Sequence, residues 1–102
     1  MATPRPRVWS DMSSNEVRQH FLEWRAPLRG ACITLHSWAT DPAGPTFSNL
    51  KVQGTRTVVD ITAPAIGQKV RYNIRCKMTD DSGHIHETEP PVELTVQPGG
   101  NF

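Results

Sequence analysis

The segment from Val70 to Met78 constrains the fold of this chain more than any other. Its apolar side chains fall on even positions, namely Val70, Tyr72, Ile74, Cys76 and Met78. Polar side chains alternate with them on odd positions, namely Lys69, Arg71, Asn73, Arg75 and Lys77. Successive side chains of a strand point to opposite faces, so this alternation predicts a β-strand with one buried face and one solvated, basic face.

A tight turn follows this strand, and a second apolar run ends in Val92, Leu94 and Val96. Asp81-Ser82-Gly83 fits a three-residue hairpin loop, because Gly83 supplies the left-handed conformation that such loops need. The residue numbers of facing pairs then sum to 164, which predicts Met78–His86, Cys76–Thr88, Tyr72–Val92 and Val70–Leu94 on the apolar face and Lys77–Glu87, Arg75–Glu89 and Arg71–Glu93 on the charged face. A slip of one residue would break all three charge pairs, so we expect them to specify the register.

Pro90 and Pro91 interrupt the last strand of this hairpin. Proline has no N–H to donate to a ladder and is found mainly at sheet edges and bulges. We therefore expect the last strand to be an edge strand that the prolines protect from stray pairing.

Three further segments have the composition of strands. Residues 31–39 place Ile33 and Leu35 on the inner face, with Cys32, Thr34 and His36 on the other. Residues 47–52 form a less regular strand that stops at Gly54, and residues 55–62 carry Thr57, Val59 and Ile61 on one face and Arg56, Val58 and Asp60 on the other. Short strands separated by Gly/Pro turns, without helical crossovers, predict an all-β, antiparallel sandwich.

The residues Ile61, Pro64, Ile66-Gly67 and Tyr72 resemble the strand-to-strand corner of immunoglobulin-like and fibronectin type III domains. In those domains a tyrosine hydroxyl bonds back to the backbone across the corner. The resemblance implies an immunoglobulin/fibronectin III-like β-sandwich with Tyr72 in that role. The alternative is a Tyr72 packed in the core with its hydroxyl at the rim.

The segment before residue 25 fits more than one structure. Pro4, Arg5, Pro6 and Arg7 favour an extended, polyproline-like conformation, and Val8 and Trp9 follow them. Such a segment fits either a disordered tail or an arm that binds a neighbouring subunit or a proline-binding groove. We expect residues 1–16 to be an extended arm, residues 17–98 the sandwich and residues 99–102 a short tail, with residues 1–12 apart from the core. Residues 13–25 fit a short helix, through the Ser13-x-x-Glu16 spacing of a capping box, or a first strand over residues 21–24, and Pro27 ends either one.

Composition argues against several classes of partner. The formal net charge of the 102 residues is +1, which gives no global attraction to nucleic acid or to a membrane. No run approaches the roughly 18 apolar residues of a membrane span. The N-terminal residues lack the apolar region of a secretory signal, so we expect synthesis and folding in a reducing cytoplasm.

Few residues have the pattern of a chemical site. His84 and His86 share one face of the hairpin near Asp80 and Asp81, but a metal needs three or four converging ligands, so we expect polar rim residues. Cys76 points inward and Cys32 outward, which argues against a disulfide. No serine or cysteine has a neighbouring His-Asp pattern and no phosphate loop is present. We therefore expect no enzyme activity, no catalytic residue, no metal and no cofactor.

The stretch from about residue 18 to residue 97 resembles small tailed-bacteriophage proteins encoded among the virion structural genes. The resemblance rests on an aromatic-rich opening, on Ser37-Trp38-Ala39-Thr40-Asp41-Pro42-Ala43-Gly44, and on the succession of strand, Gly, aromatic strand and Asp-Gly-type hairpin from Val58 to Gly83. Two departures from the family pattern are the charged, helix-like segment Val17–Trp24 and the Pro-Arg arm.

The resemblance implies a non-enzymatic virion protein of the fibre–tail adaptor or head decoration type, made in the host cytoplasm and assembled in many copies. Its partners would be other virion proteins of the tail, fibre or capsid, with no nucleic acid, membrane or small-molecule substrate. The alternative is a stand-alone peptide- or carbohydrate-binding module. The residues that we expect to contact partners are Pro4, Arg5, Pro6, Arg7, Val8, Trp9, Trp24 and Trp38.

Overall fold

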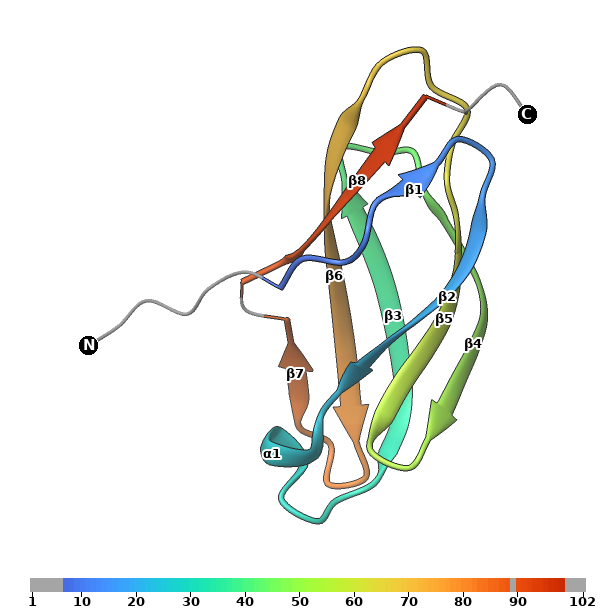
Figure 1. The fold of residues 1–102 in the computed structure, drawn as a ribbon. Coiled ribbons are helices and arrows are strands. Elements are labelled where there is room, and N and C mark those ends of the chain that lie inside the picture. Colours follow the sequence, from blue (N-terminus) through green and yellow to red (C-terminus); the bar gives the residue numbers. More distant parts are fainter. Residues whose placement is uncertain (1–6, 89, 99–102) are drawn as a thin grey trace.

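The chain folds into two β-sheets packed face to face, with a single helical turn at one end (Figure 1). The structure is a computed structural model and describes residues 7–88 and 90–98. The first sheet contains β1 (Met12–Ser13), β8 (Val92–Gln97), β6 (Val70–Asp80) and β3 (Ile33–Asp41) in that order, and β7 (Ile85–Glu87) also pairs with β6. The second sheet contains β2 (Val17–Glu23), β5 (Arg56–Thr62) and β4 (Thr46–Gln53), and the helical turn is α1 (Arg25–Leu28). The predicted all-β sandwich is confirmed.

The core lies between the sheets and is built from the faces that the alternation predicted. On β6 the buried side chains are Tyr72, Ile74, Cys76 and Met78, each at most 3% exposed, with exposed Arg71, Asn73, Arg75 and Lys77 between them. On β5 the face of Thr57, Val59 and Ile61 is fully buried, and Val58 on the opposite face is also buried, at 2% exposure. Two-residue periodicity therefore identified both segments as strands and the buried face of β6.

The hairpin between β6 and β7 has the predicted loop, but its register changes further along. Gly83 has a φ of 85°, and Asp80 N–H donates to the His84 carbonyl at 2.9 Å. The Lys77–Glu87 and Met78–His86 pairs are confirmed, and Thr88 N–H donates to the Cys76 carbonyl while Cys76 N–H donates to the Thr88 hydroxyl. Beyond the prolines the pairs are Ile74–Val92, Tyr72–Leu94 and Val70–Val96, so the predicted Tyr72–Val92, Val70–Leu94 and facing Arg71–Glu93 pairs are wrong.

The shift equals two residues, which the proline-containing break between β7 and β8 absorbs. A shift of two keeps every side chain on its own face, because the strand period is two. Arg71 still reaches Glu93 at 3.5 Å across a diagonal. The predicted partner of Arg75, Glu89, lies outside the described residues.

The N-terminal segment is part of the fold from Arg7 onward. Trp9 N–H donates to the Glu93 carbonyl at 3.0 Å, Glu93 N–H donates to the Arg7 carbonyl at 2.8 Å, and β1 pairs parallel with β8. Met12 is 1% exposed and belongs to the core. Two expectations are therefore wrong: β8 is not an edge strand, and residues 7–12 are not apart from the core. The predicted contact residues Pro4, Arg5 and Pro6 lie outside the described residues.

Residues 13–25 resolve into a turn, a strand and the start of α1. The Glu16 carboxylate accepts from Ser13 N–H at 2.8 Å as in a capping box, but Glu16 N–H donates to the Ser13 carbonyl at 3.0 Å. Asn15 has a φ of 64°, so the spacing closes a turn and no helix follows. Pro27 lies inside α1, where the first-turn N–H groups need no intrahelical partner.

A bulge in β3 reverses one predicted face. The register against β6 shifts between Ile33 and Leu35, which leaves Ile33 buried and turns Leu35 outward at 58% exposure. The inward placement of Leu35 is therefore wrong, and His36 and Trp38 take inner positions opposite Met78 and Cys76. An extra residue in a strand re-aims every side chain after it.

Tyr72 packs as the alternative interpretation expected. A Cβ added to Gly44 would lie 2.8 Å from the Tyr72 hydroxyl oxygen, so the phenol is pressed against the turn between β3 and β4. Among the described residues, the Tyr72 hydroxyl makes no hydrogen bond to the corner between β5 and β6. Tyr72 is 3% exposed, and its side chain stabilises the fold by packing in the core.

Candidate protein-interaction site

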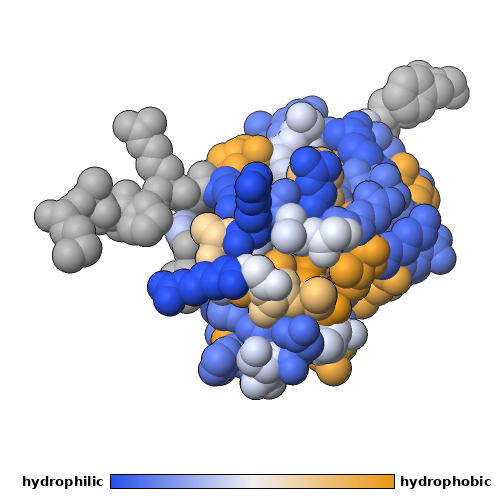
Figure 2. All heavy atoms as spheres, turned by 90° about the horizontal axis from the view of Figure 1, so that it is seen from below, coloured by the Kyte–Doolittle hydropathy of each residue, from blue (hydrophilic) through white to orange (hydrophobic). Residues whose placement is uncertain are grey.

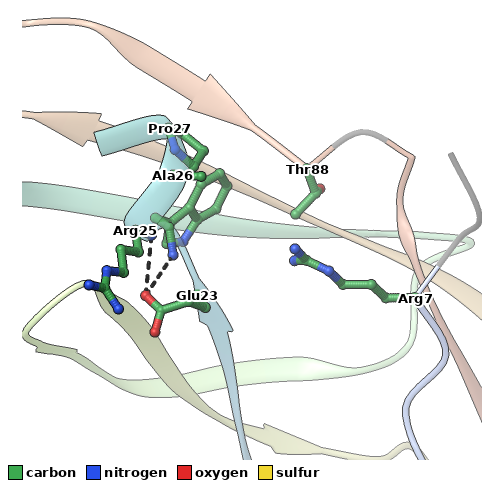
Figure 3. Close-up of a pocket in the computed structure, with 7 residues that line it drawn as sticks. Arg7, Glu23, Arg25, Ala26, Pro27 and Thr88 are labelled. Carbon is green, nitrogen blue, oxygen red and sulfur yellow. Dashed lines mark hydrogen bonds between the residues drawn. The ribbon is translucent and has the colours of Figure 1, made fainter. Parts of the chain in front are cut away.

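A groove follows the free edge of β2, between the two sheets. It consists of one cavity of about 640 Å³ beside α1 and a second of about 390 Å³ beside Trp9. Arg7 and Glu23 line both, so the two cavities adjoin at these residues. We call them together the β2 groove. In Figure 3, Arg7 and Thr88 stand on one side of the larger cavity, and Glu23, Arg25 and Pro27 stand on the other.

Five consecutive residues of β2, from Gln19 to Glu23, line the smaller cavity. Neighbouring side chains of a strand point to opposite faces, so a cavity that touches all five lies along the strand's edge. The opposite wall is Arg7 and Trp9, held in place by their backbone bonds to Glu93. The groove therefore exists only because the N-terminal segment pairs with β8.

Three of the predicted contact residues line this groove: Arg7, Trp9 and Trp24. Val8 is 66% exposed on the adjoining segment. Trp38 does not reach the groove lining, since its side chain faces the interior opposite Cys76. Trp9 and Trp24 thus line different cavities of the groove, whereas Trp38 lies behind Trp9 in the interior.

Trp24 is mainly a core residue, which the sequence did not indicate. It is 4% exposed, and its indole Nε1–H donates to Thr57 Oγ1 at 2.8 Å. The Thr57 oxygen is in turn 3.8 Å from the Cys76 sulfur. A buried indole N–H needs a partner, so the inward Thr57 of β5 fixes the ring where it forms the base of the groove.

An aromatic cluster supports the groove from inside the sandwich. The Trp9 ring lies 4.3 Å from the His20 ring and 6.3 Å from the Trp38 ring, centroid to centroid, and Trp38 stacks on Phe47 at 6.1 Å. Trp38 Nε1–H donates to His36 Nδ1 at 2.8 Å. Burial lowers the pKa of both His20 and His36, so both rings are neutral at pH 7 and the cluster packs as an apolar unit.

Cationic side chains outnumber carboxylates in the groove lining. Glu23 accepts hydrogen bonds from the Thr55 hydroxyl, Arg56 Nε at 3.3 Å, and the backbone N–H groups of Trp24 and Arg25. The Thr55 bond is the largest of the effects that hold the pKa of Glu23 below its ordinary value. Arg7 and Arg25 line the groove too, and both are exposed. Among the described residues that line the groove, the charged side chains are therefore two arginines, Arg7 and Arg25, and one carboxylate whose acceptor sites are occupied.

Apart from the β2 groove, a more polar cavity of about 830 Å³ lies between α1 and the β6–β7 turn. There the Asp80 carboxylate accepts from His86 Nε2 at 3.1 Å and from the Ser82 and His84 N–H groups at 2.9 Å. Burial raises the pKa of Asp80, but these hydrogen bonds outweigh it and the net shift is downward. Within residues 7–88 and 90–98, no three His, Cys, Asp or Glu side chains converge as metal ligands.

The cysteines have the predicted exposures. Cys32 is exposed and Cys76 is buried, and both thiols are free. Burial raises the pKa of Cys76 to about 12, which keeps it a thiol at neutral pH. Across the described part of the chain, no serine or cysteine side chain is hydrogen-bonded to a histidine.

Sequence reasoning missed the groove because it left β2 undecided between helix and strand. The strand puts His20 and Leu22 inward and exposes Phe21 at 50%. Arg56 covers part of Phe21, with its guanidinium carbon 4.5 Å from the ring centroid. The signal that was present is the alternation from Val17 to Glu23, in which the odd positions are exposed.

Comparison with known proteins gives a fold likeness and no family. No protein-family model matches the chain, and no curated protein matches it. Among solved structures, the fold is similar to part of a 2,6-sialyltransferase from Vibrionaceae Photobacterium sp. JT-ISH-224, in a ternary complex with CMP and lactose, at a TM-score of 0.51 and 18% identity. The match covers 94% of this chain and 19% of that enzyme, so it concerns the fold alone.

The surface of the described residues is mostly hydrophilic. Seen from the end that carries α1, hydrophobic side chains break through it in places (Figure 2). No helix of the described residues has the length and apolarity to cross a membrane.

Proposed function

We propose that the chain is a non-enzymatic structural protein of a bacteriophage virion, a tail- or fibre-attachment adaptor assembled in multiple copies. The resemblance of residues 18–97 to small virion proteins supports the class. The observation that carries the proposal in this structure is the β2 groove, an open sheet edge lined by Arg7, Trp9 and Trp24. Open edges and grooves of this kind bind extended segments of other proteins.

A capsid decoration protein is the alternative within the same class, and a stand-alone peptide-binding module is the alternative outside it. The groove favours a peptide over a carbohydrate in the latter case, since an open sheet edge can pair with an extended backbone, which a sugar lacks. The adaptor and its alternatives predict different particles after deletion of the gene that encodes the chain.

Quantitative mass spectrometry of gradient-purified particles tests the class directly. The particles come from the phage that encodes the chain, and an isotope-labelled peptide of residues 57–69 serves as the standard. We expect a fixed number of copies per particle. Particles without the chain would refute a virion role.

Deletion of the gene then separates the two virion alternatives. Loss of an adaptor leaves particles that lack fibres or tails, as seen by electron microscopy, whereas loss of a decoration protein leaves complete but fragile heads. Complete and normally stable particles after deletion would contradict both.

A further inference from the structure

The free edge of β2 presents unpaired backbone groups to the groove. Trp24 N–H donates to the Thr55 carbonyl at 2.8 Å, so Trp24 belongs to a hydrogen-bonded pair of the antiparallel ladder. Such pairs recur at every second residue, so Leu22 and His20 direct their backbone groups toward β5. The intervening residues, Glu23, Phe21 and Gln19, direct theirs to the opposite side. Among the described residues, β5 is the only strand that pairs with β2.

The groove runs along this edge. Its lining includes the same three residues, and its far wall is the segment of Arg7 and Trp9. The cavities of about 640 Å³ and 390 Å³ leave room for a short extended segment to lie beside β2. An extended chain placed there would complete the ladder of the second sheet with its own N–H and C=O groups.

The charge of the groove selects the side chains of that segment. Arg7 and Arg25 line the groove, and Glu23 is already occupied by Thr55, by Arg56 of the neighbouring strand β5 and by two backbone N–H groups. A carboxylate at the groove would meet cationic guanidinium groups, whereas a lysine there would meet like charge. The exposed half of Phe21 offers an apolar contact on the outer face of the same edge.

We propose that the β2 groove binds an extended, acidic peptide segment of a partner protein as an added strand. The inference rests on the proposed function, because it names the kind of partner that this edge takes. The segment alternates apolar residues, which face Phe21, with aspartate or glutamate, which faces the groove and pairs with Arg7 and Arg25. The backbone of Gln19, Phe21 and Glu23 supplies the ladder hydrogen bonds.

Titration of the ¹⁵N-labelled chain with acetyl-TVEVDVT-amide, followed by amide chemical shifts, tests the proposal. We expect the largest shifts at Gln19, Phe21 and Glu23, with a Kd in the range of roughly 0.1–1 mM. The peptide acetyl-TVKVKVT-amide should bind about tenfold more weakly, because both carboxylates become cations. A peptide of the first sequence with N-methylated valines should lose binding, because it lacks the ladder donors.

Charge reversal on the protein provides the matched control. The double variant R7E/R25E should weaken binding about tenfold or more, whereas R29E should stay within about twofold. Arg29 is an equally exposed arginine that lines the neighbouring cavity and not the groove. All three side chains are on the surface, so the variants should keep the native amide spectrum.

Three results would overturn the proposal: largest shifts on β3 or β4, equal binding of the lysine peptide, or no shift at about 1 mM peptide. Absence of peptide binding combined with fixed copies of the chain in particles would refute this inference and leave the virion role intact. Peptide binding combined with particles that lack the chain would support this inference and refute the virion role.

Discussion

Shortening Met12 to alanine measures whether the N-terminal segment is part of the fold. Met12 is 1% exposed, faces Val96 across the parallel β1–β8 pair and belongs to the core cluster. Removal of a buried methionine side chain to alanine costs about 2–5 kcal/mol, since the transfer energy is lost and a cavity remains. A domain of this size has a total stability of about 5–15 kcal/mol, so the loss is a large fraction of it.

The assay is guanidinium chloride unfolding followed by tryptophan fluorescence, with thermal unfolding as a second measure. We expect M12A to lower the melting temperature by at least about 8 °C, since 1 kcal/mol corresponds to about 4–8 °C in a domain of this length. Val8→Ala is the matched control from the same segment. Val8 is 66% exposed, so this change should stay within about 0.5 kcal/mol.

Equal stabilities of M12A, V8A and the wild type would refute the packing of the N-terminal segment against the core. The segment would then lie free of the core, and the wall of the β2 groove that carries Arg7 and Trp9 would not exist. A loss at Met12 without a loss at Val8 is the pattern that a docked segment requires.

Three further predictions concern the core and the turn. Thr57→Val leaves the Trp24 indole N–H without its partner and should cost about 1–3 kcal/mol in unfolding free energy, whereas Thr57→Ser should keep the hydrogen bond and lose less. The fold lowers the pKa of Asp80, so ionised Asp80 adds its full stabilisation to the free energy of unfolding above its ordinary pKa of 3.8 and loses it as the pH falls through the folded pKa. Between pH 6 and pH 3, the free energy of unfolding should therefore fall less in D80N than in the wild type. A thiol reagent at pH 7.5 should label exposed Cys32 rapidly and buried Cys76 only after unfolding, and equal labelling rates would contradict the burial.

The strand β6 was predictable because it has one buried face and one solvated face, which gives a period of two. In β5 the same period marks Thr57, Val59 and Ile61, although Val58 on the other face is buried too. The period of β6 and the chemistry of the Asp81-Ser82-Gly83 loop are both local. The first half of the hairpin register followed from these two facts. The second half did not, because Pro90 and Pro91 interrupt the ladder and nothing local tells how many residues leave it.

Non-local events account for the remaining errors. The bulge between Ile33 and Leu35 has no glycine to announce it, and it exchanged the inner and outer positions of β3. The N-terminal segment joins β8 as a parallel pair, which no turn signal precedes, so Met12 had no predicted place in the core. Apolar residues at Phe21 and Trp24 fitted helix and strand equally, and only pairing with β5 decides between them.

The candidate site depends on the same non-local pairings. Arg7, Trp9 and Trp24 were expected as contact residues, but the groove that unites Arg7 and Trp9 with β2 follows from pairing of the first segment with β8. The role of Trp24 as a buried anchor depends on Thr57, which is 33 residues away. A sequence pattern gives residue types and local periods, whereas this site is a contact between the edges of two sheets.

Hydrogen–deuterium exchange on the chain, free and assembled in particles, tests whether a partner strand covers the free edge of β2. We expect the amides of Gln19, Phe21 and Glu23 to exchange freely in the isolated protein and to slow by about tenfold or more in the particle. Peptides that cover β4, the other edge of the same sheet, provide the reference and should change less. Equal exchange of β2 in both states, or slowing confined to β4, would contradict it.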